Sequence, residues 1–198
     1  TSSNYSTYHW SVTTDDVFEM VKKVRQKTQI PLCFMTYLNV VFHYGYDKFF
    51  QKCQEVGIDG IILPDLPYEE SQEVKDVCYK YDVTLISMIA PTSQDRIEMI
   101  AKEAKGFIYL VSSMGVTGTR DNASFSSHLD EIIQHIRSLT DTPVAIGFGI
   151  NNPQQVKMFK QYADGVIVGS AIVNIIKEYA DKGDDALIQY VQSLTEVL

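Results

Sequence analysis

The chain has 198 residues, of which 45% are hydrophobic and 21% charged, and its formal net charge is −8. This composition suits one globular domain with a well-developed core and excludes collagen-like and disordered classes. The acidic balance, with no basic run, argues against nucleic acid, and no apolar run approaches the roughly 18 residues of a membrane helix.

The three cysteines, Cys33, Cys53 and Cys78, lack metal-ligand spacing and lie in apolar surroundings. Such thiols are typical of a reducing compartment, so we expect a cytoplasmic protein. The four histidines are scattered through the chain, and no metal site is expected from them.

Short apolar stretches alternate with amphipathic ones along the chain. Residues 1–11 are an arm with no assigned structure. Helices are predicted over 14–27, 46–56, 69–81, 95–104, 128–139 and 171–179, with a further helix beginning at Asn152-Pro153. Strands are predicted over 30–41, 60–63, 83–90, 106–111, 143–149 and 165–170.

This alternation predicts a parallel α/β sheet that is covered on both faces. A closed (β/α)8 barrel of the TIM class has eight strands and about 250 residues. Six strands are recognisable here. We therefore expect a single, incomplete TIM-barrel domain over residues 1–198, whose two missing units precede Thr1.

The last two predicted strands end in glycine corners, at Gly147-Phe148-Gly149 and at Gly169-Ser170. Glycine allows a ligand to approach the backbone closely, and each corner is followed by a predicted helix N-terminus, which favours an anion. One such corner is often required only by turn geometry. Two in succession indicate a phosphate site, since barrels often place one after their last two strands.

Other strand ends carry further candidates. Asp65 lies between two prolines and is either a general acid or base or a turn former. Tyr109 lies within a strand and faces either the pocket or the core. The segment 112–127 is rich in glycine and hydroxyl residues, which predicts a lid that orders over a ligand, although an idle surface insertion has the same composition.

Five motifs follow one another along the chain, namely Tyr37-Leu38-Asn39, Pro64-Asp65-Leu66-Pro67, Tyr109-Leu110-Val111-Ser112 with Gly115-Val116-Thr117-Gly118, Gly147-Phe148-Gly149-Ile150 and Gly169-Ser170-Ala171-Ile172-Val173. In this order they resemble the tryptophan synthase alpha chain family. The resemblance runs from about Val12 to Leu198, and residues 1–10 resemble nothing in the family.

The resemblance implies a lyase that cleaves indole-3-glycerol phosphate to indole and glyceraldehyde 3-phosphate, without a cofactor of its own. Indole would pass to a pyridoxal-phosphate-dependent beta chain in an alpha2beta2 heterotetramer. The implied phosphate and pocket residues are Tyr109, Thr117, Gly118, Gly147, Phe148, Gly149, Gly169 and Ser170. Asn39 and Pro67 would face the beta chain.

The sequence also departs from the family. The family's catalytic glutamate, and its aspartate within a Pro-Phe-Ser-Asp-Pro segment, have no counterpart here. We therefore assign no catalytic residue and expect these 198 residues to release no indole. Two alternatives stay open, namely a non-catalytic partner of a beta chain and another phosphate-binding barrel, such as an isomerase that uses paired acids.

Overall fold

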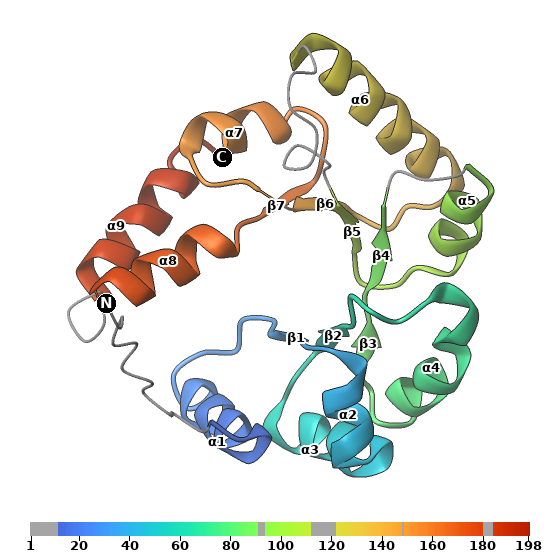
Figure 1. Cartoon of the computed structure of the whole chain (residues 1–198), viewed down its shortest axis with the longest axis vertical. Coiled ribbons are helices and arrows are strands. Elements are labelled where there is room, and N and C mark those ends of the chain that lie inside the picture. Colours follow the sequence, from blue (N-terminus) through green and yellow to red (C-terminus); the bar gives the residue numbers. More distant parts are fainter. Residues whose placement is uncertain (1–11, 91–93, 112–121, 148, 180–183) are drawn as a thin grey trace, which may run out of the picture. The chain divides into compact units, whose positions relative to one another are not determined.

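The computed structural model describes residues 12–90, 94–111, 122–147, 149–179 and 184–198, with the backbone alone over 122–127. These residues form two compact units, Thr1–Thr84 and Leu85–Leu198, and each is described by itself (Figure 1). The expectation of one domain stays a prediction. Among the described residues, no helix is long and apolar enough to cross a membrane.

The first unit contains a small sheet in the order β1-β2-β3, in which β1 and β2 are parallel and Phe34 pairs with Ile61. Its elements are α1 (Thr14–Arg25), β1 (Cys33–Met35), α2 (Leu38–Tyr44), α3 (Tyr46–Val56), β2 (Gly60–Ile62), the 3₁₀ turn η1 (Tyr68–Glu70), α4 (Ser71–Lys80) and β3 (Thr84–Leu85).

Local signals predicted the helices α1 and α3 correctly. Thr13 begins α1 with a capping box, in which its hydroxyl accepts from the Asp16 N–H at 3.2 Å and the Asp16 carboxylate accepts from the Thr13 N–H at 2.8 Å. The hydrogen bonds from Thr13 also lower the pKa of Asp16. The helix α3 has the predicted bounds and ends at Gly57, whose φ of 81° is left-handed.

The predicted strand over 30–41 is wrong in its second half, where Leu38–Tyr44 form the helix α2. The two Asp65 carboxylate oxygens accept from the Leu38 N–H at 2.9 and 3.1 Å and so cap this helix from the loop that follows β2. The β-branched and aromatic residues of the run favour a strand locally. The cap from Asp65, which is 27 positions further along the chain, stabilises the helix against this local preference for a strand.

Aromatic packing dominates the core of the first unit. The ring of Phe18 lies 5.6 Å from that of Phe34 and 5.4 Å from that of Phe49, between centroids. Cys53 and Cys78 are also buried, and desolvation raises the pKa of each thiol to about 12. Cys33 is exposed, and partial burial with the nearby Asp59 charge raises its pKa less.

These environments predict selective thiol labelling. At pH 8 a disulfide reagent should modify Cys33 alone in the native chain, and slowly, because its thiolate is disfavoured. Cys53 and Cys78 should react only after denaturation. Thiol counting by absorbance, with the Cys33→Ser variant as control, measures this difference. Rapid labelling of all three native thiols would contradict the packing.

The second unit contains a parallel sheet in the order β4-β5-β6-β7, with its helices along the strands (Figure 1). Its elements are β4 (Ser87–Ile89), α5 (Gln94–Glu103), β5 (Ile108–Val111), α6 (Asn122–Leu139), β6 (Val144–Gly147), α7 (Pro153–Phe159), β7 (Gly165–Ile167), α8 (Ser170–Tyr179) and α9 (Asp184–Thr195).

Alternate side chains of β5 and β6 pack into this unit's core. Ile108, Leu110, Val144 and Ile146 are fully buried in one cluster with residues of α5, α6 and α7. Because successive side chains in a strand point to opposite faces, the residues between them occupy the other face of the sheet. Tyr109 and Gly147 are therefore on the same face, opposite to this cluster.

Three predictions in this region need correction. The single strand over 83–90 is two strands, β3 and β4, separated at Ile86. The helix α6 begins at Asn122 instead of 128, so residues 122–127 of the predicted lid are helical, and 112–121 lie outside the described residues. The helix α9 was not predicted.

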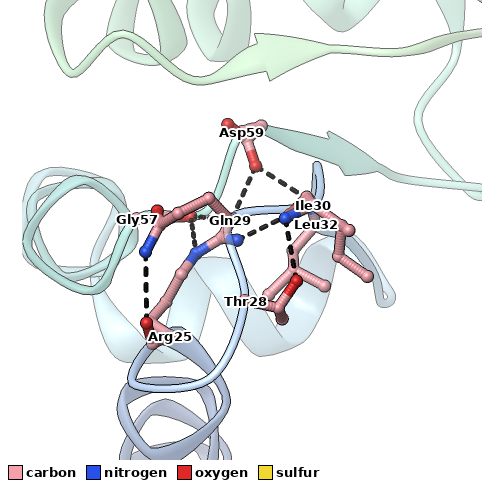
Figure 2. Close-up of polar contacts among 7 residues, drawn as sticks. All are labelled: Arg25, Thr28, Gln29, Ile30, Leu32, Gly57 and Asp59. Atoms are coloured by element: carbon pink, nitrogen blue, oxygen red, sulfur yellow. Dashed lines mark hydrogen bonds and ion pairs between the residues drawn. The ribbon is translucent and has the colours of Figure 1, made fainter.

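A polar clasp fixes the start of the first sheet (Figure 2). The Asp59 N–H donates to the Leu32 carbonyl at 2.9 Å, and the Asp59 carboxylate accepts from the Leu32 N–H at 2.8 Å. Arg25 at the end of α1 donates to the Asp59 carboxylate at 2.7 Å, to the Gly57 carbonyl at 2.9 Å and to the Ile30 carbonyl at 2.6 Å. The clasp thus joins one helix to two neighbouring strands.

The same clasp occurs in the second unit. The Asp164 N–H donates to the Val144 carbonyl at 2.9 Å, and its carboxylate accepts from the Val144 N–H at 2.9 Å. Arg137 of α6 donates to that carboxylate at 3.1 Å. In each unit the aspartate comes directly before the first glycine of a strand and binds the residue before that glycine's partner on the neighbouring strand. The arginine that binds the aspartate comes from the helix that leads into this neighbouring strand.

Candidate functional site

The two predicted glycine corners follow neighbouring parallel strands. In the pairing of β6 with β7, Gly147 lies opposite Ile167. Gly149 and Gly169 each come two residues after this pair. Because the strands are parallel, both corners lie at the same edge of the sheet, where their carboxyl ends meet.

Tyr109 and Gly147 pack directly against each other. A Cβ atom added to Gly147 would lie 2.3 Å from the Tyr109 Oη and 2.4 Å from its Cζ, which no real contact allows. The phenol therefore occupies the space beside the Gly147 backbone. Tyr109 is only 7% exposed, and burial raises its pKa, so the hydroxyl stays protonated and can donate a hydrogen bond.

The other two corner glycines differ in what they require. Gly149 has a φ of 77°, a left-handed conformation that favours glycine whatever the surrounding space. Gly169 has neither that conformation nor any atom within 4 Å of an added Cβ. Within the described residues nothing prevents a side chain at Gly169, so the fold itself does not require glycine there.

The helix after each corner begins differently. Asn152 and Pro153 begin α7 as predicted, and the Asn152 side chain accepts from the Gln155 N–H at 2.9 Å. The Gln155 side chain in turn accepts from the Asn151 N–H at 2.8 Å. The first turn of α7 is therefore capped from within the chain, which leaves it fewer backbone donors for an anion.

The helix α8 has no such cap from its leading residue. The Gly169 carbonyl accepts from the Val173 N–H at 3.2 Å, which makes Gly169 the residue that precedes the first turn. Glycine has no side chain with which to bind the first N–H groups of the helix. As far as the described residues show, this corner therefore leaves backbone donors of α8 for an anion.

The remaining predicted residues lie elsewhere. Asn39 on α2 and Pro67 before η1 are both exposed, within the first unit. For Asp65, the structure favours the turn former over the general acid or base. The Leu66 N–H donates to the Leu63 carbonyl across the turn, and the Asp65 carboxylate caps α2. Three predicted site residues lie outside the described residues, namely Thr117, Gly118 and Phe148.

Sequence reasoning missed one residue that contacts a corner. The Tyr190 hydroxyl on α9 donates to the Asn151 carbonyl at 3.0 Å, two residues after Gly149. The helical spacing of Leu187, Tyr190 and Leu194 after an acidic first turn is a signal that could have identified α9. Nothing in the sequence indicates the hydroxyl's partner.

Comparison with known proteins gives a family match over most of the chain. The family model described as tryptophan synthase alpha chain matches residues 2–197. The chain belongs to the tryptophan synthase alpha chain family. The tryptophan synthase alpha chain of Lacticaseibacillus casei is 44% identical over 184 residues, which are 93% of this chain and 68% of that relative. The tryptophan synthase alpha chain of Lactiplantibacillus plantarum is 50% identical over 166 residues, which are 83% of this chain and 62% of that relative.

Solved structures agree with this assignment. Tryptophan synthase subunit alpha from Campylobacter jejuni superposes with a TM-score of 0.84 at 38% identity, covering 93% of this chain and 72% of that one. These matches confirm the α/β fold of the TIM-barrel class. As a tryptophan synthase alpha chain, the protein is a lyase of tryptophan biosynthesis.

The extent of the match corrects the sequence reading. Residues 1–10 were expected to resemble nothing in the family, but all of them except Thr1 fall within the matched range. The narrower expectation, that these residues are the C-terminal three quarters of a family member, is not borne out by a match that runs from residue 2 to residue 197.

Proposed function

We propose that the corners at Gly147–Gly149 and Gly169-Ser170 hold the phosphate of indole-3-glycerol phosphate, which the tryptophan synthase alpha reaction cleaves to indole and glyceraldehyde 3-phosphate. The observation that carries this proposal is Gly169. Among the described residues, no atom lies within 4 Å of a Cβ added at Gly169, so we attribute the glycine to a ligand that approaches the backbone.

Backbone donors of α8 and the hydroxyl of Ser170 would bind the phosphate oxygens. The positive end of the helix dipole adds an attraction that a neutral ligand would not gain. Tyr109 would line the pocket as a neutral donor, since its raised pKa makes it a poor base near neutral pH. Phe148, Thr117 and Gly118 complete the proposed set.

The retro-aldol step needs an acid to protonate the indole ring at C3 and a base to take the glycerol hydroxyl proton, each contributing about 10²- to 10⁴-fold. Asp65 was the one strand-end carboxylate proposed for such a role. Its contact with the Leu38 N–H favours a structural role instead. We therefore assign no catalytic residue, and the isomerase alternative, for which Asp65 was already a poor fit, is weakened further.

The partner is a tryptophan synthase beta chain, which would receive indole. A solved relative from Pyrococcus furiosus, 27% identical with a TM-score of 0.80, is described as an α2β2 complex. We propose Asn39 and Pro67, both exposed, as residues that face the beta chain. A cytoplasmic location belongs to the same proposal, and the free cysteines are in keeping with it.

Ligand titration tests the phosphate site. Calorimetry with indolepropanol phosphate should show binding to the 198-residue chain, and Gly169→Ala should weaken it about tenfold or more, because a methyl group would occupy the ligand's approach to the α8 donors. The melting temperature should stay unchanged, since the added Cβ meets no atom of the residues that the structure describes.

Gly165→Ala is the matched control. Its Cβ would make an ordinary 3.4 Å contact with Ala145 at the opposite end of β7, and its affinity should equal that of the parent chain. Equal affinity in Gly169→Ala would overturn the proposed site. Preference for an aminoribosyl phosphate over indolepropanol phosphate would favour the isomerase alternative.

A further inference from the structure

We propose that Tyr190 of α9 is a positioning residue for the phosphate corner that follows β6. This inference rests on the proposed function of that corner. Tyr190 does not reach the ligand itself in this proposal. It acts through the backbone of Asn151, which comes two residues after Gly149.

Both backbone polar groups of Asn151 are held by side chains. Its carbonyl accepts from the Tyr190 hydroxyl at 3.0 Å, and its N–H donates to the Gln155 side chain at 2.8 Å. Its own side chain accepts from the Asn152 amide at 3.0 Å. Three hydrogen bonds, two to its backbone and one to its side chain, thus hold Asn151 in place two residues after Gly149, whose φ of 77° is left-handed.

The body of Tyr190 is anchored to the core of the second unit. Its half-buried ring packs against the buried cluster, and Leu194, one turn further along α9, is a buried member of that cluster. Burial raises the pKa of Tyr190, so its hydroxyl remains a donor well above neutral pH. The donor is therefore rigidly placed before any ligand binds.

The helix α9 also links the two corners. It packs against α7, which follows the β6 corner, and against α8, which follows the β7 corner (Figure 1). At its end, the Lys160 ammonium donates to the carbonyls of Val197 and Leu198. The helix α9 thus contacts the helix that follows each of the two corners proposed to enclose the phosphate. Through the Tyr190 hydroxyl it also donates a hydrogen bond to the segment after the β6 corner.

The test compares two single-atom deletions. Tyr190→Phe keeps the ring and removes the hydroxyl. Tyr162→Phe is the matched control, since Tyr162 is also half-buried against the same cluster and lies near the opposite edge of the sheet, beside Asp164. Each variant is titrated with inorganic phosphate and with indolepropanol phosphate, and its melting temperature and amide hydrogen exchange are measured.

Tyr190→Phe should weaken both ligands about three- to tenfold, the value of one neutral hydrogen bond. The amides of Gly149 and Asn151 should exchange faster, while the melting temperature changes no more than in Tyr162→Phe. Tyr162→Phe should bind as the parent chain does. Equal affinity and equal exchange in Tyr190→Phe would overturn the positioning role.

A parent chain that binds neither ligand would instead overturn the phosphate site, so the two failures are distinguishable. Gln155→Ala provides a second variant, because it frees the Asn151 N–H without touching α9. It should also raise the dissociation constant, and an unchanged value in both variants would show that Asn151 needs no support.

Discussion

Gly147→Ala should destabilise the second unit by about 2–3 kcal/mol, the usual cost of forcing extra volume into a packed region. The new methyl group would lie 2.3 Å from the Tyr109 Oη, 2.4 Å from its Cζ and 2.7 Å from its Cε1. The buried ring cannot move away without leaving its place on the sheet. Urea unfolding, followed by circular dichroism, measures the free-energy change.

Shortening the partner tests whether Tyr109 is the cause. Combining Gly147→Ala with Tyr109→Val should recover at least about 1 kcal/mol relative to additive single effects, because the clash disappears. Additive losses would show that the Tyr109 ring does not set the cost at Gly147. Gly165→Ala again serves as control and should stay close to the parent chain, since it makes only an ordinary contact.

Arg25→Ala should cost the first unit about 2 kcal/mol, since its charged side chain donates to two carbonyls and one carboxylate. The Arg25 side chain is only 14% exposed, whereas Arg137 and its partner Asp164 are 40% and 46% exposed. Arg137→Ala, which removes one bond of 3.1 Å, should therefore cost no more than about 0.5 kcal/mol.

Chemical denaturation of both variants, compared at equal salt, measures the difference. Arg25→Lys should recover little, because a lysine ammonium cannot reproduce the three-way contact of the guanidinium group. Equal losses in Arg25→Ala and Arg137→Ala would contradict the importance of the two backbone carbonyls.

The parts of the fold that the sequence predicted correctly are those set by residues close together in the chain. The helix α3 combines helical spacing of Phe49, Phe50, Cys53 and Val56 with a stop at Gly57, and both signals lie within a dozen residues. The glycine corners were likewise visible as apolar runs that end in glycine. Resemblance then supplied the roles of these residues, which spacing alone does not give.

The errors came from partners distant in the sequence. The helix α2 depends on the Asp65 carboxylate, which caps it. The positioning role proposed for Tyr190 depends on the Asn151 carbonyl, 39 positions away. The different reasons for glycine at Gly147 and Gly169 were also invisible, because they depend on whether a tyrosine of the neighbouring strand fills the space. Such contacts exist only once strands and helices have paired.

The repeated clasp bears on how the chain acquires its structure. Asp59 and Arg25 make their bonds wholly inside the first unit, and Asp164 and Arg137 make theirs wholly inside the second. Each unit thus contains its own set of one helix and two strands joined by such a clasp, through contacts that span 34 residues in the first unit and 27 in the second. Because neither set of contacts crosses between the units, native-state hydrogen exchange should reveal two cooperative foldons, one in each unit.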